Sequence, residues 1–335
     1  MTGTFTLDPI YTRKRWIINV VLTLSVLHHS DSAIALPLNS QVTAGQVTIS
    51  TPSLLNMHIA QESNKAIVNW NSFSIAKGES IVITQPSSQS TLLNRVIGNN
   101  PSQIFGSLSA NGQVFLVNPN GILFAPGSSI NAAGIVASTL AIKDSDFLLQ
   151  KYAFFKNDAA GSVYNKGTIK AGFTSLISST NADNAGTIIT SKGSTGMAAG
   201  DGVTLSFDND GLIALKVDKA AYNAQVKNSG VIEADGGIVM LSTSAADALL
   251  ATVVNNTGQL RAAKIVIEGG SIVNSGNVEA GNKIATLAAG ALINTGIFNA
   301  AEINAKVNNL LDAGTWKSGG GLNGGNIIIS ATGIR

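Results

Sequence analysis

Short triplets of the form Asn/Asp-x-Gly recur along the second half of the chain, and each one opens a new apolar run. Consecutive triplet glycines are separated by 18 to 28 residues, and a period of about 20 residues is typical of a solenoid. The triplets begin at Asn165, Asn184, Asn209, Asn228, Asn256, Asn274, Asn294 and Asp312. The pattern predicts stacked coils, in which each repeat contacts its neighbours, rather than a globular domain.

The apolar runs have the length and composition of short β-strands. After the triplet glycines, one or two apolar residues alternate with polar ones, as in residues 167–171, 230–234 and 276–280. Between them lie runs rich in β-branched residues, at 238–241, 265–267 and 327–329. Such residues suit a pleated, half-buried surface, so each repeat is predicted to hold about three strands.

The corners and the proline distribution favour one kind of solenoid. We expect the glycine of each triplet to supply the positive φ of a sharp bend, and the asparagine to tolerate the left-handed region. No proline follows Pro126, as a parallel ladder requires, because proline has no N–H to donate. The fixed Leu-x-x-Leu-x-Leu pattern of leucine-rich repeats is missing. These features predict an all-β parallel β-helix.

Composition and charge limit where the protein is located and which classes of partner it can bind. Residues 13–15 are basic, an apolar stretch from Trp16 to Leu27 follows, and residues 33–35 read Ala-Ile-Ala, so residues 1–35 are predicted to be a secretory signal peptide. The full chain carries a net charge of only +2. Removal of residues 1–35 would leave a nearly neutral protein. This balance argues against a nucleic-acid partner, which would need a dominant basic patch. The chain has no cysteine, so no disulfide would hinder passage of an unfolded chain across a second membrane.

Residues 36–142 differ in composition from the repeats, because they hold six of the seven prolines. Residues 113–117 predict a strand, and residues 122–124 predict the next one. Between them, Asn118-Pro119-Asn120-Gly121 predicts a tight turn in which proline fixes φ and Asn-Gly takes the positive-φ positions. We interpret residues 36–142 as the cap of the β-helix and residues 143–335 as its repeats.

The sequence of this region resembles the amino-terminal secretion domain of two-partner secretion exoproteins, the filamentous haemagglutinin and high-molecular-weight adhesin group. The resemblance covers residues 39–142, and the motifs fall in the family's order. They are residues 68–75, Asn94-Arg95-Val96, residues 111–116 and Asn118-Pro119-Asn120-Gly121-Ile122.

The resemblance implies a right-handed β-helix and a secreted or surface protein of a Gram-negative bacterium. It implies that an outer-membrane barrel transporter recognises the chain. It also implies that the exoprotein binds a receptor, either on a host cell or a glycan. It also marks Asn94, Arg95 and the turn Asn118, Pro119, Asn120 and Gly121 as the secretion motif. We expect the cap to nucleate folding outside the cell. A second Asn-Pro-Asn-Leu motif is missing, which places the chain nearer the adhesin branch.

Two other functions remain open alongside adhesion. One is the secretion domain of a haemolysin or toxin, and the other is a β-helix enzyme that acts on polysaccharide. Such an enzyme needs clustered acids, and the best local cluster is Asp201, Asp208, Asp210 and Asp218. We expect these corner acids to be solvated, and the sequence predicts no enzyme.

No cofactor or metal site is predicted. Glu233 and Asp235 have no basic neighbour in the local sequence, and His58 is the only histidine after residue 35. The Gly-x-Gly-x-x-Gly string at 319–324 precedes a predicted strand rather than a helix, so it fails as a dinucleotide motif.

Residues 144–156 gather many of the aromatic side chains of the chain. We predict that this segment, near residues 144–160, leaves the coil and packs against its outside. An exposed adhesive patch is the alternative.

Overall fold

The computed structural model describes residues 36–157, 161–191, 193–208, 211–244, 253–319 and 326–334. The predicted signal peptide lies outside these ranges. The described residues are almost all strand or turn, with one short helix, α1 (Asp144–Leu148). No helix in the described ranges is both long enough and apolar enough to span a membrane.

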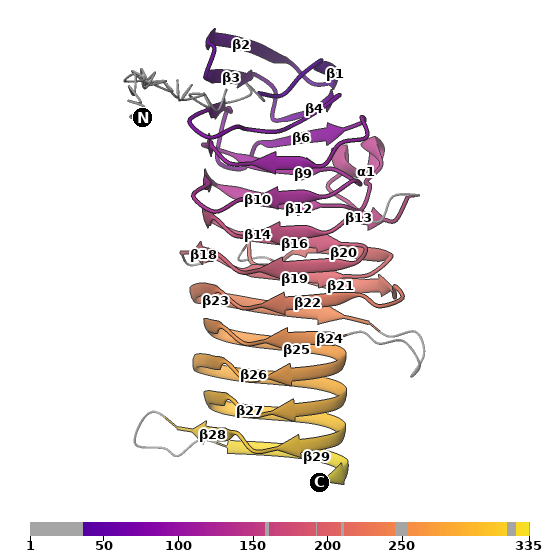
Figure 1. The fold of residues 1–335 in the computed structure, drawn as a ribbon, viewed down its shortest axis with the longest axis vertical. Coiled ribbons are helices and arrows are strands. Elements are labelled where there is room, and N and C mark those ends of the chain that lie inside the picture. The colour runs from indigo at the N-terminus through magenta and orange to yellow at the C-terminus, as the bar shows by residue number, and fades with distance from the viewer. Residues whose placement is uncertain are drawn as a thin grey trace, which may run out of the picture. The chain divides into compact units, whose positions relative to one another are not determined.

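Strands from successive coils lie parallel and in register, and three strands make one coil (Figure 1). Each strand of one coil pairs with its counterpart in the next, as β14 pairs with β17, β15 with β18 and β16 with β19. Their bounds are β14 (Val163–Asn165), β15 (Thr168–Ala171), β16 (Thr174–Ser178), β17 (Asn181–Asn184), β18 (Thr187–Thr190) and β19 (Thr195–Ala199). The chain is therefore a right-handed parallel β-helix, as predicted.

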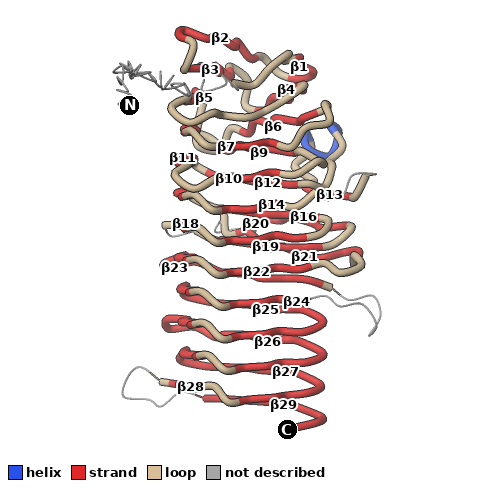
Figure 2. Tube along the Cα trace, in the orientation of Figure 1, coloured by secondary structure: helices blue, strands red, loops and turns tan. Residues whose placement is uncertain are grey.

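The later coils are more regular than the earlier ones. Their strands run around the corners with almost no interruption, so the tube in Figure 2 is nearly continuous red there. They are β22 (Gln225–Asn228), β23 (Val231–Thr243), β24 (Val253–Asn256), β25 (Gln259–Asn274), β26 (Asn277–Asn294), β27 (Ile297–Asp312), β28 (Thr315–Ser318) and β29 (Asn326–Ile334). The predicted strands at 265–267 and 327–329 lie within β25 and β29.

Apolar residues stack inside the coil from one turn to the next. Val226 lies in register with Val254, Val254 with Ile272, Ile272 with Leu292 and Leu292 with Leu310. Each of these five side chains is at most 7% exposed. Because a coil covers its apolar face only by stacking on its neighbours, this column holds the repeats together.

The amino-terminal end of the coil is closed by antiparallel pairs. β1 (Gln41–Ala44) pairs with β4 (Lys65–Trp70), and β2 (Val47–Ser53) pairs with β3 (Asn56–Gln61). β2 carries Pro52 at an irregularity in this pairing, which fits an edge strand because proline cannot donate to a ladder. Parallel stacking begins at β3 and β4. It continues through β5 (Ser80–Thr84), β6 (Thr91–Val96), β7 (Ser102–Ile104), β8 (Ser107–Ala110), β9 (Gln113–Val117), β10 (Ile122–Phe124), β11 (Ser129–Ala132) and β12 (Gly134–Ser138).

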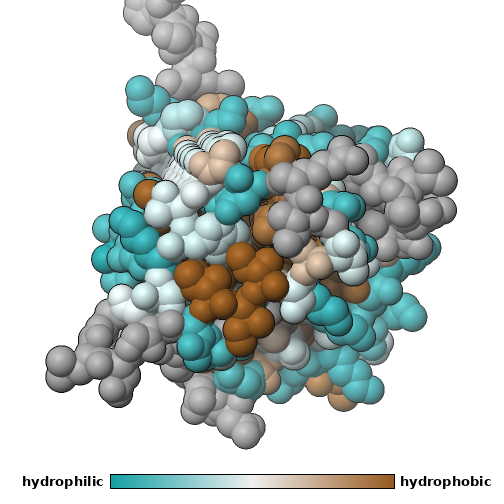
Figure 3. Space-filling model, turned by 90° about the horizontal axis from the view of Figure 1, so that it is seen from below, coloured by the Kyte–Doolittle hydropathy of each residue, from teal (hydrophilic) through white to brown (hydrophobic). Residues whose placement is uncertain are grey.

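The opposite end of the described coil presents apolar side chains. Figure 3 views this end and shows hydrophobic residues gathered near its centre. Ile327, Ile328 and Ile329 of β29 are 41%, 52% and 36% exposed, and Leu311 of β27 is 54% exposed.

The asparagines of the corner triplets form a ladder inside the coil. Nδ2 of each donates a hydrogen bond to the side-chain oxygen of the next, over 2.7 to 2.9 Å. Every asparagine in the ladder is at most 1% exposed, so each buried amide is paired. The members are Asn165, Asn184, Asn228, Asn256, Asn274 and Asn294, with Asp312 as the last acceptor.

The predicted role of the corner glycines is wrong. None of the ladder glycines has a positive φ; they are needed because the neighbouring coil leaves no space for a side chain. A Cβ at Gly186 would lie 2.2 Å from the carbonyl oxygen of Gly167, and one at Gly258 would lie 2.1 Å from that of Gly230. Such distances are shorter than any van der Waals contact, so a side chain there would push the neighbouring coils apart.

A second layer packs on the outside of the coil. It consists of α1 and an antiparallel sheet of β13 (Tyr152–Phe155), β20 (Gly202–Phe207) and β21 (Ile213–Lys219). In the described part of the predicted excursion near 144–160, Phe147, Tyr152 and Phe154 are buried. The triplet at 209–211 was wrongly predicted as a coil corner. Gly211, with φ of 75°, lies in the turn between β20 and β21, and Asn209 and Asp210 lie outside the described residues.

Candidate functional site

The predicted secretion turn lies between β9 and β10. Both predicted strands are present, and the turn closes with a hydrogen bond of 3.1 Å from Gly121 N to the carbonyl oxygen of Asn118. Gly121 has a φ of 123°, as predicted, whereas Asn120 does not have a positive φ, contrary to the prediction. Proline at the second position and glycine at the fourth are preferences of a type I turn, in which the third residue keeps a negative φ.

Asn118 holds this turn to the preceding coil from inside. Its side chain is fully buried, and its Nδ2 donates to the carbonyl oxygen of Asn100 and to Oγ of Ser102, both over 3.0 Å. Its Oδ1 accepts from the backbone N–H of Asn120 over 3.0 Å, which is an Asx turn. Asn118 therefore has a structural role and offers no group to a partner.

Asn120 extends the connection on the outside. Its Nδ2 donates to the carbonyl oxygen of Gly98 over 2.8 Å. Gly98 itself lies tightly against the coil, because a Cβ there would lie 2.2 Å from the carbonyl oxygen of Asn71. The Asn118–Gly121 turn is thus hydrogen-bonded to the segment at Gly98, and that segment packs against the preceding coil at Asn71.

Asn94 and Arg95 are adjacent in β6 but face opposite sides. Asn94 is fully buried within the coil, and its Oδ1 accepts from Nε1 of Trp70 over 3.0 Å. Arg95 faces the outer layer, where its Nη2 donates to the carbonyl oxygen of Ile142 over 2.8 Å and forms an ion pair with Asp144. The alternation of side chains along a strand explains this division.

A surface pocket of about 390 Å³ joins the two motifs. It arises because β6 and β9 are parallel neighbours, with Arg95 in register with Val117, one residue before the turn. Its wall includes Arg95, Ile97, Pro119 and Asn120. The structure therefore brings Arg95, Pro119 and Asn120 together at the surface and places Asn94 and Asn118 inside.

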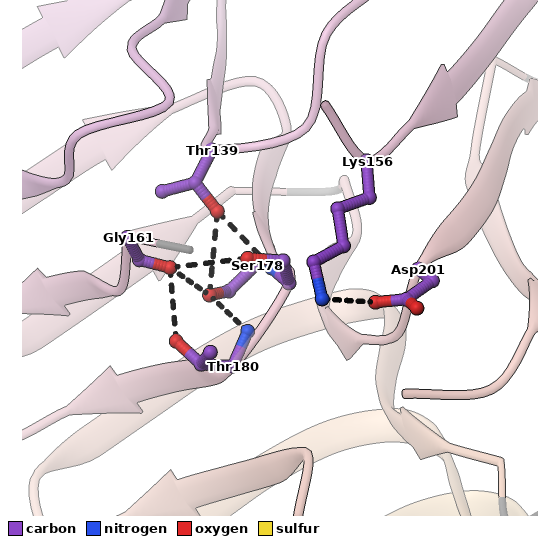
Figure 4. Close-up of polar contacts among 7 residues, drawn as sticks. Thr139, Lys156, Gly161, Ser178, Thr180 and Asp201 are labelled. Atoms are coloured by element: carbon purple, nitrogen blue, oxygen red, sulfur yellow. Dashed lines mark hydrogen bonds and ion pairs between the residues drawn. The ribbon is translucent and has the colours of Figure 1, made fainter. Parts of the chain in front are cut away.

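The acids weighed for catalysis are engaged in separate contacts. Asp201 pairs with Lys156 over 3.1 Å (Figure 4), and Asp218 pairs with Lys216 over 3.3 Å. Asp208 accepts from the backbone N–H of Leu212, while Asp210 lies outside the described residues. In the part of the chain that the structure describes, no three His, Asp or Glu side chains gather as a metal site would require.

The expectation for Glu233 and Asp235, which have no basic neighbour in the local sequence, is wrong for the folded chain. Glu233 and Asp235 have a basic partner that the local sequence did not reveal, since Arg261 of the next coil pairs with both over 3.2 Å. The in-register stacking of β23 and β25 places Arg261 beside Glu233. His58 is half-buried, and its Nε2 lies beside Oγ1 of Thr84.

Sequence reasoning missed a buried cluster of hydroxyl groups where the chain returns to the coil. The carbonyl oxygen of Gly161 accepts from Oγ1 of Thr180 over 2.9 Å and from Oγ of Ser178 over 3.1 Å (Figure 4). Thr139 of the preceding coil joins through a bond of 3.1 Å from Ser179 N to its Oγ1. The run of serine and threonine at 178–180 was the available signal, but its partners lie up to 40 residues away.

The family model of the TPS (two-partner) secretion domain matches residues 33–287, which is more than half of the chain. The chain belongs to the two-partner secretion domain family. It is 32% identical over 274 residues, 79% of its length, to a heme/hemopexin-binding protein of Haemophilus influenzae. It spans 30% of the length of that relative.

The fold agrees with that of one solved secretion domain. The HMW1 secretion domain of Haemophilus influenzae superimposes with a TM-score of 0.75 at 24% identity, covering 85% of this chain and 84% of that one. The filamentous hemagglutinin secretion domain gives a TM-score of 0.46 at 14% identity, covering 88% of this chain and 99% of that one. Two-partner exoproteins are secreted by Gram-negative bacteria to the cell surface or the medium, so the chain is a secreted protein of an exoprotein family rather than of an enzyme family.

Proposed function

We propose that this secretion domain is recognised by a cognate outer-membrane transporter and starts the folding of an exoprotein outside the cell. The observation that carries the proposal is the match to the two-partner secretion domain over residues 33–287. The antiparallel pairs β1–β4 and β2–β3 close one end of the ladder, so new coils add at the other end only. Folding that propagates from a formed end would prevent emerging chain from sliding back.

The composition supports the same role. A chain without cysteine cannot be locked by a disulfide before it crosses the outer membrane. The predicted signal peptide, residues 1–35, supplies the first export step. We propose the divisions at residues 35 and 142 as the limits of the signal peptide and of the cap.

The first experiment measures partner-dependent secretion. The chain is expressed in a Gram-negative host with and without a candidate partner barrel, and processed protein in the medium is quantified. Protein should appear in the medium only with the barrel. Equal amounts without it would overturn the proposal.

A second set of variants tests the turn. Asn120→Ala with Gly121→Val should abolish secretion, because valine does not tolerate a φ of 123° and alanine removes the bond to Gly98. The matched control is Gln103→Ala, at an exposed position of β7, which should be secreted normally. Normal secretion of the double variant would exclude a role for the turn.

A second candidate function concerns what the exoprotein binds. The relative at 32% identity is a heme/hemopexin-binding protein, which favours hemopexin as a host ligand of this exoprotein. The resemblance separately implies an adhesin that binds a host-cell or glycan receptor. Retention of hemopexin by immobilised protein, compared with serum albumin, tests this. Lysis of erythrocytes tests the haemolysin alternative, which remains a prediction.

A further inference from the structure

The chain leaves the coil next to Arg95. The excursion is defined here as residues 141–157; Ile142 lies at its start, and Asp144 begins α1. Arg95 donates to the carbonyl oxygen of Ile142 over 2.8 Å and pairs with the carboxylate of Asp144. One side chain of β6 therefore holds both the start of the excursion and the first residue of the helix.

The chain returns to the coil next to the secretion turn. Gly161 N donates to the carbonyl oxygen of Pro119 over 3.0 Å. The contact is close, since a Cβ at Gly161 would lie 2.4 Å from Gly121 N. On its other side, the carbonyl oxygen of Gly161 accepts from Ser178 and Thr180, as Figure 4 shows.

The two legs of the excursion are also tied to each other and to the outer sheet. Ala141 and Phe155 exchange backbone hydrogen bonds of 2.8 and 2.9 Å. Lys156 donates its backbone N–H to the carbonyl oxygen of Asp201 over 2.8 Å, and its Nζ pairs with the carboxylate of Asp201 over 3.1 Å. Asp201 directly precedes β20, so these contacts join the excursion to the other strands of the outer sheet.

Between its two ends the excursion covers the outer face of β9. The ring of Phe115 in β9 lies 5.3 Å from that of Phe147 and 5.0 Å from that of Tyr152, measured between centroids. Phe115 is fully buried, and residues 114–117 of β9 are buried on both faces. Fixing the ends of this segment lowers the entropy lost when its aromatic residues pack.

The motif side chains have few groups left for an outside partner. Asn118 is fully buried, and the side chain of Arg95 is 19% exposed, with donors directed at Ile142, Asp144 and Asn69. We propose that Arg95 and the Asn118–Gly121 turn are positioning residues that anchor the two ends of the excursion, and that they support export by closing the outer layer rather than by contacting the transporter. The part concerning export rests on the proposed function, whereas the anchoring is a property of the folded chain.

The test compares variants of the full chain after purification. Exposed Lys151, between α1 and β13, reports on the excursion through trypsin cleavage, and amide exchange at Ala141 and Phe155 reports on its legs. Arg95→Met should speed both by about tenfold, because a charge-assisted contact to the departing leg is lost. Arg95→Lys should restore part of the protection, since it keeps a cationic donor. The matched control is Arg261→Met, which removes ion pairs at another corner and should leave both rates unchanged.

Two further variants keep the test decisive if Arg95→Met does not fold. Asp144→Asn, at a half-exposed position, should give a smaller acceleration of the same kind. Gly161→Ala should loosen the returning leg, whereas Gly281→Ala, whose Cβ would meet nothing closer than 3.7 Å, should not. Cleavage and exchange within twofold of the unmodified protein in the folded variants would overturn the inference.

Secretion of the same variants separates this inference from the proposed function. Loss of secretion together with loss of protection supports both. Loss of secretion with full protection would show that Arg95 contacts the transporter, which overturns the inference and leaves the proposed function standing. Secretion without any transporter would overturn the proposed function, while the rates on purified protein still decide the anchoring.

Discussion

Asn165 and Asn184 occupy equivalent corners of successive coils, and Nδ2 of Asn165 donates a hydrogen bond of 2.7 Å to Oδ1 of Asn184. The same contact continues down the coil to Asp312, whose other carboxylate oxygen accepts from Nε1 of Trp316 over 2.7 Å. A buried amide that both donates and accepts along the axis fixes the register of each coil on the next, because a shifted register would leave it unpaired.

Asn228→Ala should therefore destabilise the middle of the coil. It removes the acceptor of Asn184 and the donor to Asn256, and leaving buried polar groups unpaired costs about 2–4 kcal/mol in this case. The free energy of urea unfolding measures the loss. Asn299→Ala, at a half-buried position of β27, should change it by no more than about 0.5 kcal/mol. Equal losses in the two variants would contradict a special role for the ladder.

Gly258→Ala should weaken stacking although the backbone conformation at this corner suits any residue. The added Cβ would lie 2.1 Å from the carbonyl oxygen of Gly230, and overpacking of this kind costs about 1–3 kcal/mol. Thermal unfolding is expected to occur at a lower temperature than in Gly281→Ala, where the nearest atom would be 3.7 Å away. A midpoint no lower than that of Gly281→Ala would exclude a steric requirement.

Phe115→Ala should disrupt the outer layer. The ring is fully buried against Phe147 and Tyr152, and truncation of such a side chain costs about 3–5 kcal/mol. Hydrogen exchange is the informative measurement, since protection should fall in β13 and β20 before it falls in β26. Phe105→Ala serves as the control, because Phe105 is 41% exposed. A uniform loss along the whole coil would mean that the outer layer is not a separate cooperative unit.

Asp183 should make stability depend on pH in an unusual direction for an acid. Burial raises the pKa of its carboxyl above 3.8, and the charges of Lys227 and Lys166 lower the pKa by less. The folded state therefore binds the proton more tightly than the unfolded state. The contribution of Asp183 to stability is greatest below pH 3.8 and falls as the pH rises through its folded-state pKa.

Asp183→Asn tests that direction. The variant should be more stable than the unmodified protein at pH 7, and the difference should vanish below pH 3.8. Unfolding midpoints at the two pH values measure it. Lys227→Met should raise the pKa further and extend the decline in stability to higher pH. A variant that is less stable at pH 7 would show that attraction to the lysines outweighs burial.

Much of the coil could be predicted because its signal is local and repeated. All but the first glycine of the runs at 230–234 and 276–280 lies in β23 and β26, and the turn at Asn118–Gly121 lies between two strands as expected. The roles of the corner residues could not be predicted. The requirement at Gly258 comes from the carbonyl oxygen of Gly230, which lies 28 residues earlier, and not from its own φ.

The outer layer could not be predicted from the sequence either. Residues 202–207 and 213–219 resemble coil strands in composition, yet they pair as the antiparallel strands β20 and β21. The signal that a second layer exists was present in the continuous apolar run at 114–117, since a strand buried on both faces does not alternate. That signal does not say which segment covers the strand.

The sequence by itself determined the coil, because its repeated apolar positions and small corners can be satisfied only by stacking one repeat on the next. Only the tertiary structure decided what surrounds the predicted secretion motifs. Arg95 meets Asp144, and Pro119 meets Gly161, because the path of the chain returns these residues to neighbouring coils. Contacts between residues more than 40 positions apart depend on that path, which no local pattern of hydrophobic and polar residues specifies.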